Sequence, residues 1–146
     1  MKTATDFTLK DQFGKDYNLF ENLNKNVMLV FYPRDNSLVC TNQLCSYNDS
    51  FSELEKAGIK IVGINIEKET NHKQFSDKYS FKFPLLSDSE KEVSKAYDAL
   101  NYAGFNKRKI VVISRQKEII YEDVVFSLFY QKTGDILKYL KNNKYI

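Results

Sequence analysis

The chain has 146 residues, of which 42% are hydrophobic and 28% charged, with a formal net charge of +3. This composition excludes collagen-like, low-complexity and disordered chains, and the length suits one domain with one core, residues 1–146. No run approaches the roughly 20 apolar residues of a membrane span, and no segment resembles a signal peptide. We therefore expect a cytoplasmic protein with no membrane partner. We expect no nucleic acid partner either, since the chain has no basic stripe with interleaved aromatic residues.

The predicted elements of the first half are a hairpin, a strand and a helix. Residues 6–20 read as a β-hairpin with Gly14 in its turn. The apolar run 26–32 predicts a strand covered on both faces. From residue 37 to residue 56 apolar side chains recur every three or four positions, which predicts one helix with Gly58 as its stop signal.

The middle of the chain repeats the order of strand and helix. Residues 59–66 form a second apolar run, which predicts another buried strand. Thr70 is a candidate cap for the helix that follows, and a short strand comes after that helix. Asp88 or Ser89 then caps a second, shorter helix.

Two strands and a helix complete the pattern. Residues 109–114 and 117–123 predict strands joined by a turn too tight for a parallel pair, and a helical pattern begins at Asp135. The whole order predicts an α/β fold: a central mixed β-sheet flanked by helices on both faces, with an N-terminal β-hairpin. The late loop contains three aromatic side chains, which we expect to pack beneath it rather than to form an apolar patch for a partner: Phe126, Phe129 and Tyr130.

Both cysteines of the chain lie in the segment FYPRDNSLVCTNQLC, residues 31–45. Asp35 and Asn36 read as turn residues between the strand and the helix. Cys40 falls in the first turn of that helix, where free N–H groups and the helix dipole stabilise a thiolate. Cys40 also continues the apolar stripe of the helix, as a small core residue does. Its position alone leaves both interpretations open.

The spacing of the two cysteines limits what they can form together. On a regular helix, residues five apart have Cα atoms about 8–9 Å from each other, beyond the ~7 Å that a disulfide tolerates. Cys40 and Cys45 therefore cannot be bonded while the helix is intact. A structural zinc site needs four ligands, and the chain offers only one further candidate, His72. We expect no metal, and expect His72 to be solvated or to cap its helix.

The segment 31–45 resembles the active-site segment of peroxiredoxins, whose motif is Pro-x-x-x-Thr/Ser-x-x-Cys. Here the motif reads Pro33, Ser37, Cys40. A second cysteine five residues later, Cys45, resembles the bacterioferritin comigratory protein (Q-type) branch of that family. The resemblance is collinear over nearly the whole chain. Within it, RKIVVIS is similar to the strand that carries the family's active-site arginine, which corresponds to Arg108.

This resemblance implies a thioredoxin-like fold and a thiol-dependent peroxidase for hydrogen peroxide and organic hydroperoxides. Cys40 would be the peroxidatic cysteine and Cys45 the resolving one, joined in an intramolecular disulfide after local unwinding of the helix. Arg108 would stabilise the thiolate and the leaving oxygen, and Ser37 would hydrogen-bond the thiolate and the peroxide. Pro33 would shape the loop and shield the sulfenate from over-oxidation. The resemblance implies no metal or organic cofactor, recycling by thioredoxin or a similar dithiol, and a monomer or weak dimer.

The sequence departs from the family pattern just before the peroxidatic position. Leu38 and Val39 stand where the family usually has Pro-Gly, and this bulk bears on substrate access. It keeps open a second hypothesis, a thioredoxin-fold redox-sensing or binding module with little turnover. A third hypothesis, a disulfide oxidoreductase, is disfavoured because the cysteines are not spaced as Cys-x-x-Cys.

Overall fold

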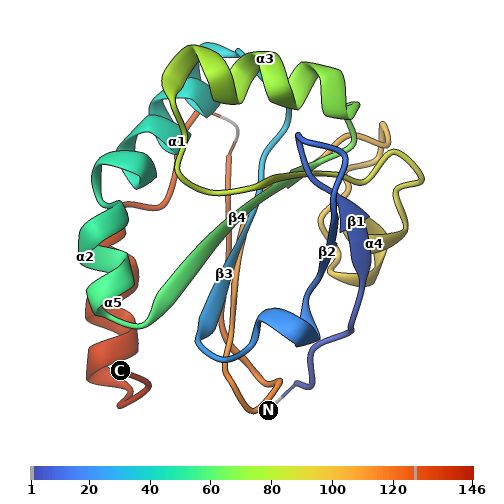
Figure 1. Ribbon diagram of the computed structural model, residues 1–146. Helices are drawn as coiled ribbons and strands as arrows, with labels where there is room; N and C mark the ends of the chain where they lie inside the picture. Colours follow the sequence, from blue (N-terminus) through green and yellow to red (C-terminus); the bar gives the residue numbers. More distant parts are fainter. Residues whose placement is uncertain (1, 127) are drawn as a thin grey trace.

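The computed structural model describes residues 2–126 and 128–146, and these residues contain one mixed β-sheet (Figure 1). Its order is β2-β1-β5-β4-β3-β6-β7. The strands β3, β4 and β5 run parallel to one another, whereas the remaining pairs are antiparallel. The strand bounds are β1 Thr8–Lys10, β2 Asp16–Asn18, β3 Asn26–Phe31, β4 Ile59–Asn65, β5 Leu85–Ser87, β6 Arg108–Ile113 and β7 Ile119–Val125.

Helices cover both faces of this sheet. Their bounds are α1 Leu38–Asp49, α2 Phe51–Lys56, α3 Glu69–Tyr79, α4 Glu92–Ala96 and α5 Thr133–Asn142, with a 3₁₀ turn η1 at Phe20–Asn22. Helices α1, α2, α3 and α5 pack against one face, and α4 with η1 packs against the other. The predicted mixed sheet, its flanking helices and its N-terminal hairpin are confirmed. In the described part of the chain, no helix has the length and apolar character needed to cross a bilayer.

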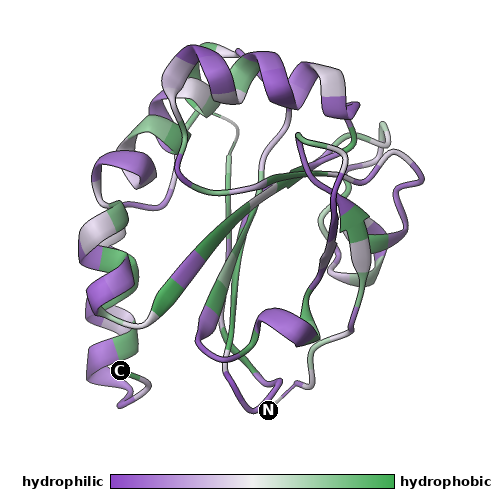
Figure 2. Cartoon of the chain, in the orientation of Figure 1, coloured by the Kyte–Doolittle hydropathy of each residue, from purple (hydrophilic) through white to green (hydrophobic). Residues whose placement is uncertain are grey.

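The central strand β3 explains why the core has two layers. Its side chains alternate between the faces: Met28 and Val30 join the cluster under α1 and α5, while Val27 and Leu29 join the cluster under α4. Figure 2 shows hydrophobic residues concentrated along β3 and β4. A strand buried on both faces has little freedom to move. The end of β3 is therefore a rigid support for the loop that leads to Cys40.

The single helix predicted over residues 37–56 is wrong, because the chain forms two helices separated at Ser50. Asn48, Asp49 and Ser50 have short polar side chains that compete for backbone hydrogen bonds, so they favour helix ends. The Asn48 side chain also donates to the Ser80 carbonyl oxygen at 3.3 Å and accepts from the Lys82 amide at 2.9 Å. These bonds tie the end of α1 to the segment between α3 and β5.

Two predicted helix caps differ in detail. Thr70 does not cap α3, because the helix begins at Glu69 and its N-cap position is Lys68. Asp88 lies four residues before α4, yet its carboxylate accepts from the Val93 amide at 3.3 Å and the Ser94 amide at 2.6 Å. Asp88 thus satisfies amides at the start of that helix from a more distant position than a regular N-cap.

Candidate active site

Cys40 lies in the first turn of α1, and Ser37 determines where that helix begins. Ser37 is the N-cap residue, with extended backbone angles, and its hydroxyl oxygen accepts a hydrogen bond from the Cys40 amide at 3.3 Å. Asn36, just before it, adopts the left-handed conformation that lets the chain turn from the loop into the helix. The cap fixes Cys40 where the amide groups and dipole of α1 favour a negative charge.

Arg108 is brought to Cys40 by the pairing of strands. Strand β6 runs antiparallel to β3 with Lys109 opposite Phe31, so the first residue of β6 lies beside the end of β3 and the start of α1. Arg108 Nη1 is 3.3 Å from Cys40 Sγ. The arginine is 3% exposed, so water screens its charge little. A guanidinium in this position stabilises a thiolate and any oxygen that becomes anionic next to it.

Gln43 is a site residue that the sequence reasoning did not identify. Arg108 Nη1 donates to Gln43 Oε1 at 2.6 Å, and Gln43 Nε2 donates to the Tyr47 hydroxyl at 3.1 Å. Tyr47 in turn donates to the Gln131 carbonyl oxygen at 2.6 Å. The signal was present in the sequence. Gln43 lies one turn after Cys40 and one turn before Tyr47, so it is a polar residue on the buried face of the helix.

Cys45 lies on the same helix and is half-buried against the core. Both cysteines are free thiols within the intact helix α1. Burial, with a smaller contribution from Asp49, raises the pKa of the Cys45 thiol. The two thiols thus have different surroundings: Arg108 and a helix start for Cys40, apolar contacts and a carboxylate for Cys45.

Alkylation of Cys45 is expected to occur at a higher pH than alkylation of an ordinary thiol. In a Cys40→Ser background, the midpoint of the iodoacetamide rate should lie above the usual thiol range, because burial and Asp49 both disfavour the thiolate. Asp49→Asn should lower that midpoint, since it removes the carboxylate and leaves the burial. The exposed Asp77→Asn is the matched control and should not move it. An unchanged midpoint in Asp49→Asn would show that this carboxylate does not act on the thiol.

The two residues that depart from the family motif have different environments. Leu38 is 78% exposed, so its side chain points into solvent and does not fill the site. Val39 is half-buried, and Cys40 is fully buried. A small molecule therefore reaches the Cys40 sulfur only when the loop and the first turn of α1 shift slightly. The obstacle to access is the burial of Cys40, not the bulk of Leu38.

The remaining predicted site residue, Pro33, borders a cavity. Together with Arg34, Ile66, Glu67 and Phe105, Pro33 lines a cavity of about 470 Å³ beside the loop. This cavity lies at the carboxyl ends of β3 and β4, where open α/β sheets commonly form binding sites. The structure thus gathers Ser37, Cys40 and Arg108 into direct contact, with Pro33 on the adjoining loop and Cys45 farther along α1.

Asp35 and Asn36 form a turn, as expected, but the expectation of a solvated or capping His72 is wrong. His72 is fully buried, and Asp35 is buried beside it. His72 Nδ1 is 2.7 Å from Asp35 Oδ2, and His72 Nε2 is 3.0 Å from the Leu86 carbonyl oxygen. Asp35 Oδ1 also accepts from the Tyr32 hydroxyl at 2.6 Å and from Asn65 Nδ2 at 3.3 Å. This polar network joins the active-site loop to β3, β4 and α3.

Both ring nitrogens of His72 have hydrogen-bond partners. The Leu86 carbonyl can only accept, so Nε2 donates to it, while Nδ1 bonds to the carboxyl group of Asp35. Both side chains are out of water. A buried polar group that loses its hydrogen-bond partner is costly, so removing either side chain should destabilise the protein.

We expect Asp35→Asn to destabilise the fold strongly. The substitution leaves the buried His72 without its carboxylate, and the loss in the free energy of unfolding should be about 3 kcal/mol. Urea unfolding followed by circular dichroism measures it. The control is Asp77→Asn, which removes one member of the exposed pair Lys73–Asp77 and should change stability by less than about 0.5 kcal/mol. A loss below about 1 kcal/mol in Asp35→Asn would show that the Asp35 carboxyl group is not needed to stabilise the buried His72.

The late-loop aromatic residues are not packed beneath the loop as expected. Phe126 is 85% and Phe129 64% exposed, and only Tyr130 makes a buried contact, edge-to-face with Tyr47 at 6.4 Å between ring centroids. Val125 pairs with Arg108 across β6 and β7. The exposed Phe126 therefore lies at the same end of the sheet as Cys40.

Comparison with known proteins agrees with the family resemblance of residues 31–45. The AhpC/TSA family pattern matches residues 1–122. Peroxiredoxin Q of Arabidopsis thaliana chloroplasts is 43% identical over 94 residues, which are 64% of this chain and 44% of that protein. The Sedum lineare counterpart is 41% identical over 95 residues, 65% of this chain and 51% of that protein. The chain thus spans about half the length of the curated relatives it matches.

Solved structures agree over the full fold. Peroxidoxin BcpB from Mycobacterium tuberculosis superposes with a TM-score of 0.84 at 27% identity, covering 99% of this chain and 96% of that one. Reduced 2-Cys peroxiredoxin of Plasmodium vivax gives a TM-score of 0.89 at 20% identity, with coverage of 99% and 95%, and shows the fold alone. The chain therefore has the thioredoxin-like fold of peroxiredoxins. The chain belongs to the AhpC/TSA family, in its peroxiredoxin Q and bacterioferritin comigratory protein branch.

Proposed function

We propose that this protein is a thiol-dependent peroxidase that reduces hydrogen peroxide and organic hydroperoxides. One observation carries the proposal: the guanidinium of Arg108 lies 3.3 Å from the sulfur of Cys40, in the first turn of a capped helix. A cation and a helix start together favour the thiolate that peroxide chemistry requires. Family membership and the motif Pro33, Ser37, Cys40 support the same assignment.

The first step is attack by the Cys40 thiolate on the terminal oxygen of the peroxide. The S–O bond forms as the O–O bond breaks, and the alcohol or water leaves after taking up a proton. Negative charge grows on the leaving oxygen, next to the guanidinium of Arg108, which is held in place by Gln43. Ser37 keeps the helix start formed around the sulfur. Pro33 shapes the adjoining loop and limits water near the sulfenic acid.

The second step joins the two cysteines. The Cys45 sulfur attacks the sulfenic acid of Cys40, water leaves, and an intramolecular disulfide forms. Because the intact helix holds the Cα atoms about 8–9 Å apart, α1 must unwind locally before this bond can form. The end of α1 is tied to residues 80–82 through Asn48, so the first turns are the ones expected to open. Thioredoxin or a similar dithiol then exchanges with the disulfide.

The experiment is peroxide-dependent oxidation of a thioredoxin system, with hydrogen peroxide and cumene hydroperoxide compared. We expect many turnovers per protein with both substrates. A single equivalent of peroxide consumed, with no further turnover in the presence of excess reduced thioredoxin, would instead favour the redox-sensing or binding module. Leu38, one of the two residues on which that second hypothesis rested, points into solvent and does not narrow the site.

Assembly and location are also proposed. We propose a monomer or weak dimer, and the exposed side chains near the site, Leu38 and Phe126, are the contacts that a reductant or second copy would cover. The cytoplasm is the proposed location, since the two thiols are free and the cycle needs a dithiol supply.

A further inference from the structure

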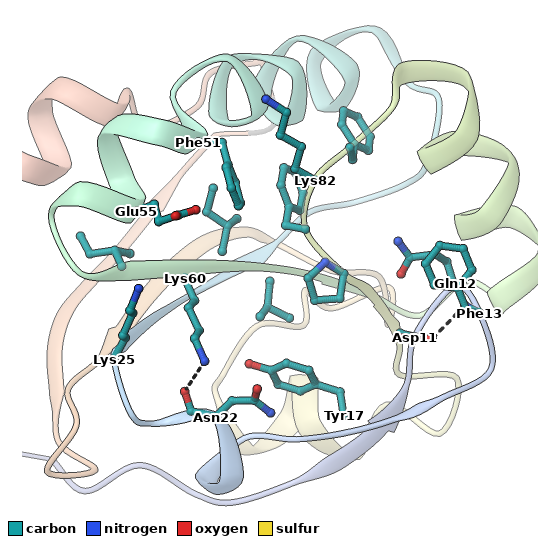
Figure 3. Close-up of a pocket in the computed structure, with 16 residues that line it drawn as sticks. Asp11, Gln12, Phe13, Tyr17, Asn22, Lys25, Phe51, Glu55, Lys60 and Lys82 are labelled. Carbon is teal, nitrogen blue, oxygen red and sulfur yellow. Dashed lines mark hydrogen bonds between the residues drawn. The ribbon is translucent and has the colours of Figure 1, made fainter.

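A second pocket lies away from the cysteines, with a volume of about 590 Å³ (Figure 3). It is lined by the β1–β2 turn, the first half of β4, α2 and residues 81–84, and includes none of the site residues described above. The pocket exists because β5 pairs only with residues 63–65 of β4. Over residues 59–62, this edge of β4 has no neighbouring strand among the described residues. Its volume falls in the range of small-molecule sites.

The walls of the pocket are mostly apolar. Its floor and sides are formed by aliphatic and aromatic side chains: Phe51, Ile61, Val62, Phe81, Phe83 and Pro84. Lysines 25 and 82 stand at the exposed rim, where Glu55 offsets part of their charge. The Asp11 carboxylate is engaged by its own turn, accepting from the amides of Phe13 and Lys15.

Lys60 brings a positive charge to the side of the pocket that lies across β4 from Phe51 (Figure 3). Its side chain is half-buried, and its ammonium donates to the Asn22 carbonyl oxygen at 3.3 Å and to Asn24 Oδ1 at 2.6 Å. Both acceptors are neutral, and among the described residues no carboxylate forms an ion pair with Lys60. Burial, and then the neighbouring Lys25, lower the pKa of Lys60. An anion placed next to this ammonium would stabilise it.

Tyr17 supplies a hydrogen-bond donor without a partner. Its hydroxyl oxygen is shielded from solvent and bonds to no other group among the described residues. Burial keeps the pKa of Tyr17 well above its usual range, so the hydroxyl stays protonated. Figure 3 shows this hydroxyl directed into the pocket, on the side from which Lys60 enters. A buried polar group with no partner is costly, so an acceptor placed beside this hydroxyl would be bound favourably.

We propose that this pocket binds a small carboxylate with an apolar body, such as a medium-chain fatty acid. The carboxylate lies between the Lys60 ammonium and the Tyr17 hydroxyl, and the apolar chain passes the unpaired edge of β4 and lies against Phe81 and Phe83. A neutral apolar ligand would leave both polar groups unpaired, and an inorganic anion would leave the apolar walls uncovered. The site is separate from the peroxidase centre and does not rest on the function proposed above.

Calorimetric titration of the full chain with octanoate tests the proposal. We expect saturable binding of octanoate, and binding at least about tenfold weaker for acetate, which lacks the chain, and for octan-1-ol, which lacks the charge. In amide NMR spectra, octanoate should shift residues 17, 60–62 and 81–83. Equal binding of octanoate and octan-1-ol, or shifts confined to other parts of the chain, would overturn the proposal.

Two substitutions separate binding from folding. Lys60→Met should weaken octanoate at least about tenfold and leave peroxidase activity within about twofold of wild type, whereas the exposed Lys141→Met should change neither. Tyr17→Phe should weaken octanoate about tenfold and yet raise the Tm of the ligand-free protein, because it removes the unpartnered hydroxyl. A Tyr17→Phe protein that has a lower Tm, or that binds octanoate as wild type does, would contradict the role of the hydroxyl.

Discussion

Replacing Cys40 by serine is expected to abolish peroxide turnover. A serine hydroxyl does not ionise at neutral pH in this site and is a poor nucleophile toward an O–O bond, whereas the Cys40 sulfur lies beside Arg108 at a helix start. Loss of a nucleophile that works with positioned partners typically lowers the rate by more than about 10⁴-fold. The measurement is oxidation of reduced thioredoxin at a fixed concentration of hydrogen peroxide.

Cys45→Ser is the matched variant, because it removes a thiol from the same helix without touching Arg108. We expect it to consume one equivalent of peroxide at the wild-type rate and then to stop or turn over slowly with thioredoxin. The sulfenic acid at Cys40 should be trapped by dimedone. Turnover that survives Cys40→Ser would show that Cys40 is not the peroxidatic cysteine. A Cys45→Ser protein that does not consume even one equivalent of peroxide would show that Cys45 does more than resolve the sulfenic acid.

Arg108→Met is expected to slow the oxidation of Cys40 by about 10²- to 10³-fold. Methionine occupies a similar volume and removes the cation that lies 3.3 Å from the sulfur. It also removes the donor to Gln43. Arg108→Lys should fall between wild type and Arg108→Met, because it keeps the charge and loses the planar fork that reaches Cys40 and Gln43 together. Stopped-flow consumption of the first equivalent of peroxide isolates this step from reduction by thioredoxin.

The control for charge alone is Arg115→Met, which removes an exposed arginine from the turn between β6 and β7. Its rate should equal that of wild type. Circular dichroism and Tm distinguish a loss of chemistry from a loss of fold in Arg108→Met. A folded Arg108→Met protein that oxidises within about threefold of wild type would show that this guanidinium has no electrostatic role.

The features that sequence reasoning predicted well are local or strongly patterned. The apolar runs of β3 and β4 are buried on both faces, so almost every residue carries the signal. The motif residues Ser37 and Cys40 are three positions apart and share one helix start. Arg108 was identified as a site residue only through the family resemblance. It lies 68 positions from Cys40 and contacts it because β3 pairs with β6.

The features that sequence reasoning missed depend on contacts between distant segments. His72 and Asp35 are 37 positions apart, and only the packing of α3 over the active-site loop makes them a buried pair. The break at Ser50 reflects the bonds of Asn48 to residues 80 and 82, which no helical period reveals. Gln43 could have been identified, because a polar side chain on a buried helix face needs a partner.

Mass spectrometry after one equivalent of hydrogen peroxide tests the central claim most directly, that Cys40 is oxidised and then resolved by Cys45 within one chain. The account predicts that the wild-type chain loses two hydrogen atoms, and that peptide mapping finds Cys40 bonded to Cys45. The bond should form only when α1 opens, so amide exchange in the first turns of α1 should be faster in the oxidised protein than in the reduced one. Added oxygen retained on Cys40 with Cys45 still free, or a disulfide joining two chains, would contradict the account.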